Sequence, residues 1–392
     1  MDHALEHHKT YIGRPASELP SPALVLSLPV MKKNIGRLHD DVEKMGLGFR
    51  PHVKTLKSLE LTRMMLANGK YRSIVASTIP EIKGSLPLAA EGILDECLYG
   101  LPVYPSILPQ LTALRSSLRI LLLVDHVSQL SKLEKHSSSS QPWDVFIKLD
   151  VGSHRAGVAP QSDTLHALVR AAEASPAVNI YGFYCHANHS YAGRTRAEAE
   201  ETLRIEWDSV ISAAKLLPSD RHLVASVGAT PTAHVVKSLR ADAPGNIKLE
   251  LHAGNFPCND LQQVSTGVIS MQDQAARVLA DVVSVYPGAR NEALLNAGVT
   301  SLSRETSPGF SGFGRVVGKE ETWGVVRMSQ EHGILGWIGE REAKNIEEEF
   351  SVGERAMVWC NHVCITAAAF FVYFVVDGDD IVRETWMPWK GW

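Results

Sequence analysis

Residues 145–186 read VFIKLDVGSHRAGVAPQSDTLHALVRAAEASPAVNIYGFYCH. Two short apolar segments, Val145–Asp150 and Ile180–His186, flank an amphipathic stretch at Asp163–Ala174. A short apolar run, a helical period and a second apolar run are typical of a βαβ unit. This stretch therefore predicts parallel strands joined by a helix.

The same rhythm extends outward over the first two thirds of the chain. Apolar runs recur at intervals of roughly 25 to 45 residues, as βα units do, with helical stretches such as Ser58–Asn68 and Arg196–Leu217 between them. The candidate strands are Ala23–Ser27, Phe49–Lys54, Ser73–Ser77, Arg119–Val124, Val145–Asp150, Ile180–His186, Leu223–Val227 and Lys248–His252. Together they predict a TIM-type (β/α)8 barrel over residues 20–262. A doubly wound open sheet is the alternative, although no G-x-G-x-x-G follows the first strand.

The pattern changes after about residue 263, where few helical windows remain. β-rich segments separated by glycine turns predict a mostly antiparallel β domain over 263–392, with residues 1–19 packed on it. Its candidate strands are Ala293–Leu302, Thr322–Ser329, Ala356–Thr366 and Phe370–Val376. The serine-rich stretch 137–142 is expected to be a surface loop of the barrel.

Composition excludes several classes of protein. Hydrophobic residues make up 45% and charged residues 21% of the 392 residues, a balance typical of globular proteins with a large core. The net charge of −4 offers no basic surface for nucleic acid. No run is long enough for a membrane helix, and the polar start MDHALEHHKT does not resemble a signal peptide. Five scattered cysteines without a secretion signal favour a reducing, cytoplasmic setting.

Lys54 ends the second candidate strand, in the segment RPHVKT at 50–55. The carboxyl ends of barrel strands face the active site, and strand periodicity puts His52 and Lys54 on one face. A desolvated lysine is a nucleophile that can condense with an aldehyde. On spacing alone, a surface lysine at a strand end is an equally good interpretation.

Three polar segments follow later strands: HANHSY at 186–191, SVGATPT at 226–232 and HAGN at 252–255. The last two contain glycine, which lets backbone N–H groups approach a ligand. They follow the last two candidate strands, where TIM barrels commonly bind phosphate. Simple turn formation is the alternative for each segment.

His362 and Cys364 lie in NHVCIT at 361–366, which we expect to be a strand with both side chains on one face. Imidazole and thiolate together suit Zn²⁺, and two ligands leave positions open for catalysis. On spacing alone, a buried cysteine beside a hydrogen-bonded histidine is the better interpretation.

Seven motifs, taken in order, resemble the eukaryotic D-serine dehydratase and D-threonine aldolase family. They are RPHVKT at 50–55, KLDVGSHRAGV at 148–158, YCHANHSY at 184–191, SVGATPT at 226–232, HAGNFPCNDLQQ at 252–263, SQEHG at 329–333 and CNHVCITA at 360–367. Members are fold-type III pyridoxal-phosphate enzymes related to alanine racemase. The resemblance spans nearly the whole chain.

The resemblance implies roles for individual residues. Lys54 matches the Schiff-base lysine and the base at Cα, and His362 with Cys364 matches the zinc pair. The remaining matches all concern the cofactor: Tyr184 and Tyr191 contact it, Thr230, Gly254 and Asn255 form the phosphate cradle, and Arg155 faces it.

The resemblance also implies the activity. His-x-Cys members are zinc-dependent dehydratases, which convert a small D-β-hydroxy amino acid to a 2-keto acid and ammonia. The alternative is retro-aldol cleavage to glycine and an aldehyde, as in aldolases that carry His-x-Asp. A racemase would need a second base on the opposite face, and a non-catalytic pyridoxal-phosphate carrier generally lacks the β domain. A homodimer is implied as well.

Three positions depart from the family pattern: Leu56, Asn188 and Phe256. None is a matched catalytic residue. All three could reshape the substrate pocket.

Overall fold

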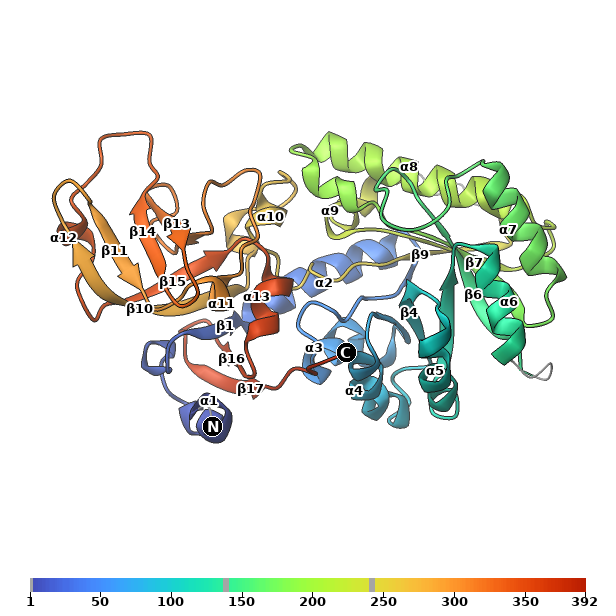
Figure 1. Ribbon diagram of the computed structural model, residues 1–392, viewed down its shortest axis with the longest axis horizontal. Coiled ribbons are helices and arrows are strands. Elements are labelled where there is room, and N and C mark those ends of the chain that lie inside the picture. The colour runs from blue at the N-terminus through green and yellow to red at the C-terminus, as the bar shows by residue number, and fades with distance from the viewer. Residues whose placement is uncertain (1–2, 137–140, 240–243) are drawn as a thin grey trace. The chain divides into compact units, whose positions relative to one another are not determined.

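The computed structural model describes residues 3–136, 141–239 and 244–392 (Figure 1). The loop predicted at 137–142 thus lies mostly outside the described residues. Within the described ranges, no helix is long and apolar enough to cross a membrane. The chain divides into two compact units, Gly36–Phe256 with Gly391–Trp392, and Met1–Ile35 with Pro257–Lys390.

The first unit contains an 8-stranded parallel sheet in the order β2-β9-β8-β7-β6-β5-β4-β3. Its strands are β2 (Gly48–Phe49), β3 (Ser73–Ala76), β4 (Glu96–Pro102), β5 (Arg119–Val124), β6 (Trp143–Leu149), β7 (Val178–Cys185), β8 (Leu223–Val227) and β9 (Ile247–Leu251). The sheet closes where His52, just after β2, bridges to Val75 on β3. The predicted (β/α)8 barrel is confirmed, and closure excludes the open doubly wound sheet.

Helices follow most of the strands and cover the outside of the barrel, as α7 and α8 do in Figure 1. They are α3 (Leu59–Met65), α4 (Ile79–Ala90), α5 (Leu108–Leu114), α6 (Val127–His136), α7 (Asp163–Ala174), α8 (Arg196–Ala214) and the short α9 (Thr230–Ala233). The helix α2 (Leu28–Lys44) crosses the boundary between the two units at Gly36. In α7, Ser162 caps the first turn, because its side chain accepts from Leu165 N–H. The helix buries Leu165, Leu168, Val169 and Ala172, the spacing of one helical face.

The predicted set of barrel strands needs two corrections, one strand removed and one added. Ala23–Ser27 forms β1, but β1 lies in the other unit, between β10 (Ala276–Tyr286) and β16 (Tyr373–Val376). The strand β4 takes its place in the barrel and was missed, because Gly100 and Pro102 interrupt its apolar run. The N-terminal boundary of the barrel unit accordingly falls at Gly36 instead of the expected residue 20.

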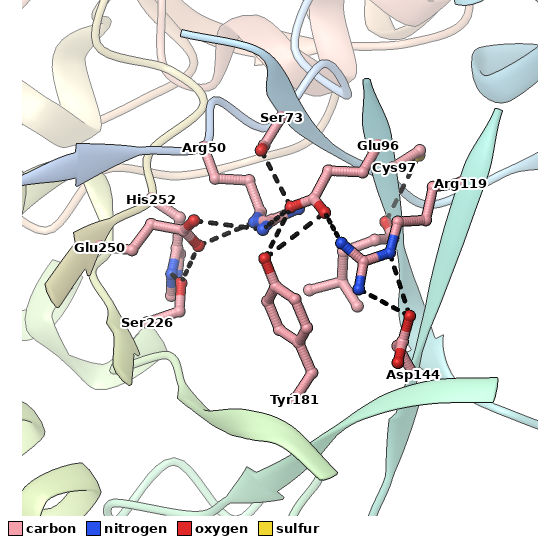
Figure 2. Close-up of polar contacts among 11 residues, drawn as sticks. Arg50, Ser73, Glu96, Cys97, Arg119, Asp144, Tyr181, Ser226, Glu250 and His252 are labelled. Carbon is pink, nitrogen blue, oxygen red and sulfur yellow. Dashed lines mark hydrogen bonds and ion pairs between the residues drawn. The ribbon is translucent and has the colours of Figure 1, made fainter. Parts of the chain in front are cut away.

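Charged side chains fill part of the barrel interior (Figure 2). Arg50, which is 0% exposed, donates to Glu250 Oε1 on β9 at 2.7 Å and to Glu96 Oε1 on β4 at 2.5 Å. Tyr181 Oη and Arg119 Nη1 each bond to the Glu96 carboxylate, both at 3.1 Å. Burial opposes ionisation of Glu96, but Arg50 lowers the pKa of this carboxyl group. The network joins strands on different sides of the barrel.

The second unit contains a 9-stranded sheet in the order β11-β14-β13-β12-β15-β10-β1-β16-β17. Besides β1, β10 and β16, its strands are β11 (Glu292–Leu295), β12 (Gly314–Val316), β13 (Trp323–Met328), β14 (Gly333–Trp337), β15 (Arg355–Cys360) and β17 (Val382–Trp386). Because β10 also pairs with β11, the sheet closes on itself from β11 to β10. All pairs are antiparallel except β1 with β16, so the predicted β domain is confirmed.

Two segments predicted as strands are partly helical. Within Ala293–Leu302, β11 is followed by α11 (Val299–Leu302). Within Ala356–Thr366, β15 ends at Cys360, and α13 (Val363–Ala369) begins three residues later. The other short helices of this unit are α1 (His3–His7), α10 (Leu261–Val264) and α12 (Ile346–Glu349).

Candidate active site

Lys54 lies in a turn at the carboxyl end of β2. The strand ends at Phe49, and the Lys57 N–H bonds to Val53 O at 3.0 Å, so the chain turns around Lys54. The predicted strand Phe49–Lys54 is therefore too long, and strand alternation does not place Lys54. The residue nonetheless stays beside His52, because its backbone N–H donates to His52 Nδ1 at 3.3 Å.

The structure brings the Lys54 turn and the two glycine-bearing segments together at one end of the barrel. The backbone N–H of His52 donates to Ala253 O at 2.9 Å. The backbone N–H of Asn255 donates to Thr230 Oγ1 at 3.1 Å. The candidate lysine and the candidate phosphate cradle thus share one mouth, as expected for the carboxyl ends of barrel strands.

Backbone segments of this mouth approach each other closely at two glycines, and at Gly228 no other residue would fit. A Cβ on Gly254 would lie 3.1 Å from His52 O, so a larger residue would press against the lysine turn. Gly228 has a φ of +136°, and a Cβ there would lie 2.2 Å from His252 O. Both glycines allow close approach of backbone segments.

Three cationic side chains surround the histidines at this end. Burial, together with the positive charges of Lys54, Lys148 and Arg155, lowers the pKa of His186 well below its ordinary value. Burial and the positive charges of Lys54 and Arg155 do the same for His52. The neutral histidines and the neighbouring cations give the mouth a positive potential that suits a phosphate.

His252 stacks on Tyr184, with ring centroids 4.0 Å apart and an interplanar angle of 9°. Ser226 Oγ donates to Glu250 Oε1 at 2.9 Å and lies 3.0 Å from His252 Nδ1 (Figure 2). Because the serine hydroxyl has one hydrogen and gives it to Glu250, Nδ1 of His252 must be the donor to Ser226. Nε2 is then an acceptor, and it is buried with no hydrogen-bond partner among the described residues.

Pyridoxal phosphate fits these residues. The mouth offers a lysine amine, a threonine hydroxyl and backbone held close by Gly254, and cations that suit a dianionic phosphate. The unpaired Nε2 of His252 is a buried polar atom for which a bound molecule would provide a partner. Donor set and charge therefore both match the group.

Two further predicted residues lie nearby. Arg155 is exposed, and its Nη1 donates to Asn188 Oδ1 at 3.3 Å. Tyr191 lies in the same short 3₁₀ helix as Asn188, Asn188–Ala192, and is half-buried. Of the positions that depart from the family pattern, Asn188 thus contacts a predicted site residue, whereas Leu56 and Phe256 are fully buried.

His362 and Cys364 lie at the start of α13, in the second unit, and not on a strand. The imidazole of His362 hydrogen-bonds to Cys364 and to Glu305, with 3.2 Å between Nδ1 and Glu305 Oε2. Burial lowers the pKa of His362, but the contact with Cys364 and the charge of Asp260 outweigh it and raise the pKa to about 9. The predicted pair is therefore in contact, through a helix start instead of strand alternation.

The chemistry of this pair suits zinc, which prefers nitrogen and sulfur ligands. Within the described ranges, no group of three or more His, Cys, Asp or Glu side chains is arranged to hold a metal. Two protein ligands would leave the remaining coordination positions to water or substrate.

Comparison with known proteins agrees with this architecture. Residues 26–247 match the family "Alanine racemase, N-terminal domain", and residues 275–376 match "Putative serine dehydratase domain". The fold is thus that of the alanine racemase class of barrel proteins. More narrowly, the chain belongs to the D-serine dehydratase family.

Three relatives illustrate this membership. D-serine dehydratase of Schizosaccharomyces pombe is 41% identical over 407 residues, covering 99% of this chain and 95% of that protein. D-serine dehydratase of Saccharomyces cerevisiae is 34% identical, covering 97% and 98%. The solved structure of D-threo-3-hydroxyaspartate dehydratase from Delftia sp. HT23 superposes with a TM-score of 0.85 at 29% identity, covering 96% of this chain and 100% of that chain. The family is one of lyases, and it implies pyridoxal phosphate as cofactor.

Sequence reasoning missed Lys148, His252 and Glu305. Lys148 had a visible signal, since a charged residue inside the apolar run VFIKL is rarely buried without a reason. His252 lies in a quoted motif, but its role depends on stacking against Tyr184. Glu305 had no local signal, because it lies 57 residues from His362 in the sequence.

Proposed function

We propose that this chain is a pyridoxal-phosphate- and zinc-dependent lyase that removes water from a small D-β-hydroxy amino acid, with D-serine as the expected substrate. The observation that carries the proposal is the meeting of the Lys54 turn with the Thr230 and Gly254–Asn255 segments at one cationic mouth. The yeast relatives, both D-serine dehydratases, support the choice of substrate.

The residues of the mouth would hold the cofactor. Lys54 Nζ would bind its aldehyde carbon, and Thr230, Gly254 and Asn255 would hold its phosphate. Tyr184, Tyr191 and Arg155 would contact the rest of the molecule. When bound, pyridoxal phosphate supplies an electron sink for the charge that develops at the substrate Cα.

Lys54 would also move the proton. Its Nζ would serve as the base that takes the proton from the substrate Cα. His362 and Cys364 would hold zinc, which supplies Lewis acidity toward the β-hydroxyl, a poor leaving group. Loss of water gives an enamine, which hydrolyses after release to pyruvate and ammonia when the substrate is D-serine.

Replacing Lys54 tests the cofactor assignment. We expect Lys54→Ala to lose the visible absorbance of bound pyridoxal phosphate and to slow turnover by roughly 10² to 10⁴-fold. Lys54→Arg keeps the charge but not the nucleophile and should behave alike. The exposed Lys83→Ala on α4 is the control and should match the wild type. Full turnover by Lys54→Ala would refute the assignment.

Chelation tests the metal assignment. We expect a zinc chelator to stop release of pyruvate from D-serine while the visible absorbance of the cofactor persists. His362→Ala should give the same result without a chelator. An enzyme indifferent to chelation would remove zinc from the mechanism.

Products from D-threonine separate dehydration from retro-aldol cleavage. Dehydration yields 2-oxobutyrate and ammonia, whereas cleavage yields glycine and acetaldehyde. We expect 2-oxobutyrate, because the pair is His-x-Cys.

We also propose a homodimer and a cytoplasmic location, which sedimentation velocity and cell fractionation would test.

A further inference from the structure

Several polar side chains that take no part in the proposed mechanism hold the turn that carries His362 and Cys364. Asp260 Oδ2 accepts from Val363 N–H, the first residue of α13, at 2.9 Å. Asp260 Oδ1 accepts from Gln263 N–H of α10 at 3.0 Å. One buried carboxylate thus joins the starts of two helices.

Because Asp260 accepts from the first turn of α13, the His362 side chain does not cap this helix. His362 occupies the N-cap position of α13, yet its side chain makes no cap hydrogen bond. Asp260 supplies a carboxylate to the first turn instead. The imidazole is therefore available for other partners.

The backbone of Glu305 is fixed next to this turn. The Asn361 side chain, 1% exposed, donates to Glu305 O at 2.9 Å and to Gly312 O at 2.9 Å. Gln262 Nε2 lies 3.5 Å from Glu305 Oε2 and donates to Thr306 O at 2.8 Å. Glu305 is thus attached to the residue before His362 and to α10.

The contact between Glu305 and His362 selects one nitrogen of the imidazole. A carboxylate can only accept, so the hydrogen of the 3.2 Å contact belongs to His362 Nδ1. In the neutral ring the other nitrogen, Nε2, then carries the lone pair. A metal ligand needs that lone pair, and an outer carboxylate on Nδ1 both orients the ring and raises its basicity.

We propose that Glu305 is the positioning residue of the metal pair: it holds His362 Nδ1–H so that Nε2 and the thiolate of Cys364 bind one zinc ion. This inference rests on the proposed function. In this role Glu305 would act only through His362, and it would bind neither the substrate nor the cofactor itself. Loss of its carboxylate should lower zinc affinity and leave cofactor binding intact.

The test measures zinc affinity of the holoenzyme by competition with a chromophoric chelator. We expect Glu305→Ala to weaken zinc binding about 10- to 100-fold. Glu305→Gln keeps an acceptor oxygen without the charge and should recover part of the loss. The exposed Glu347→Ala in the same unit is the control and should bind zinc as the wild type does. The visible absorbance of pyridoxal phosphate should be the same in all four proteins.

A second measurement replaces zinc with Co²⁺ and records its absorption in the visible range. A changed ligand field in Glu305→Ala, restored in Glu305→Gln, would support a role in orienting the imidazole. Wild-type zinc affinity in Glu305→Ala would overturn the inference alone. A wild-type holoenzyme that binds no zinc would contradict the metal of the proposed function as well. If Glu305→Ala does not fold, Glu305→Gln decides: reduced affinity supports the inference and unchanged affinity overturns it.

Discussion

Lys148 is a buried lysine inside an apolar barrel strand, with 5% of its surface exposed. Its Nζ lies 4.9 Å from the centroid of the Tyr184 ring, whose stacking partner is His252. Burial lowers the pKa of Lys148 to about 8, and the charge of Arg155 acts in the same direction. Keeping this charge in the barrel costs free energy, because burial removes the hydration of the amine.

The pKa of Lys148 predicts a stability effect that depends on pH. Between about pH 8 and 10.5 the folded protein binds fewer protons at this site than the unfolded chain, so the free energy of unfolding rises with pH. We expect cofactor-free Lys148→Met to be more stable than the wild type by up to about 3 kcal/mol below pH 8. The difference should vanish near pH 10.5. Denaturant unfolding at pH 7 and pH 10 measures the difference in free energy of unfolding between the two proteins. The same difference at both pH values would contradict this account.

Thr230 predicts an effect on cofactor binding. Its Oγ1 accepts from the Asn255 N–H at 3.1 Å, and valine would leave that buried donor without this partner, at a cost of about 1–3 kcal/mol. We expect Thr230→Val to weaken pyridoxal phosphate binding about tenfold or more, as measured by fluorescence titration of the cofactor-free protein. Thr62→Val is the matched control, because Thr62 is an equally buried threonine that bonds to Ser58 O in α3. Equal cofactor affinity in both variants would show that Thr230 has no part in the cradle.

At the scale of elements, the barrel strands are joined through charges as well as through their backbones. Arg50 links Glu250 on β9 to Glu96 on β4, and all three side chains are buried. Glu250 in turn accepts from Ser226, which bonds to His252 at the mouth. The interior network therefore connects the core of the barrel with the candidate site.

Removing the central arginine should destabilise the barrel. Arg50→Met would leave the buried Glu250 carboxylate without its cation and Glu96 with Arg119 alone, and breaking a buried pair in this way typically costs about 3–5 kcal/mol. Denaturant unfolding followed by circular dichroism checks this. Arg72→Met removes an exposed arginine that pairs with Asp95 and should leave stability near the wild type. Equal stability of the two variants would contradict a structural role for the network.

At the scale of the whole molecule, the two units are not contiguous in sequence. β1 pairs with β10 on one side and with β16 on the other, so the 9-stranded sheet needs residues from both ends of the chain. A strand in the middle of a sheet supplies hydrogen bonds to both neighbours, and its loss exposes both. The second unit therefore cannot be complete without the N-terminal segment.

A fragment experiment follows from this arrangement. We expect residues 257–390 alone to be largely unfolded, and the same fragment with residues 1–35 fused to its N-terminus through a flexible linker to fold. Dispersion of amide signals in NMR spectra distinguishes the two. A folded 257–390 fragment would show that β1 is dispensable for the sheet.

Much of the barrel could be predicted from sequence. Each βα unit buries an apolar helix face against neighbouring strands. Its apolar residues therefore recur with a period of 3.6 in the helix and 2 in the strand, and this period is visible in the local sequence. The helix α7 begins and ends where predicted. The candidate residues Lys54, Thr230 and Asn255 were found from motifs. The predicted geometry of the candidate site was only partly right. Lys54 lies in a turn and Cys364 at the start of a helix, whereas both were predicted to lie on strands.

From the residues alone one could obtain the fold class, the family and a candidate cofactor lysine, since local periodicity and short motifs carry that information. The sheet to which β1 belongs could not be obtained, because its partners lie some 250 to 350 positions away and an apolar strand looks the same in either sheet. The contact between Glu305 and His362 and the stack of His252 on Tyr184 likewise follow from folding. Such contacts join residues distant in sequence, and they exist only once the chain has closed its barrel and its β sheet.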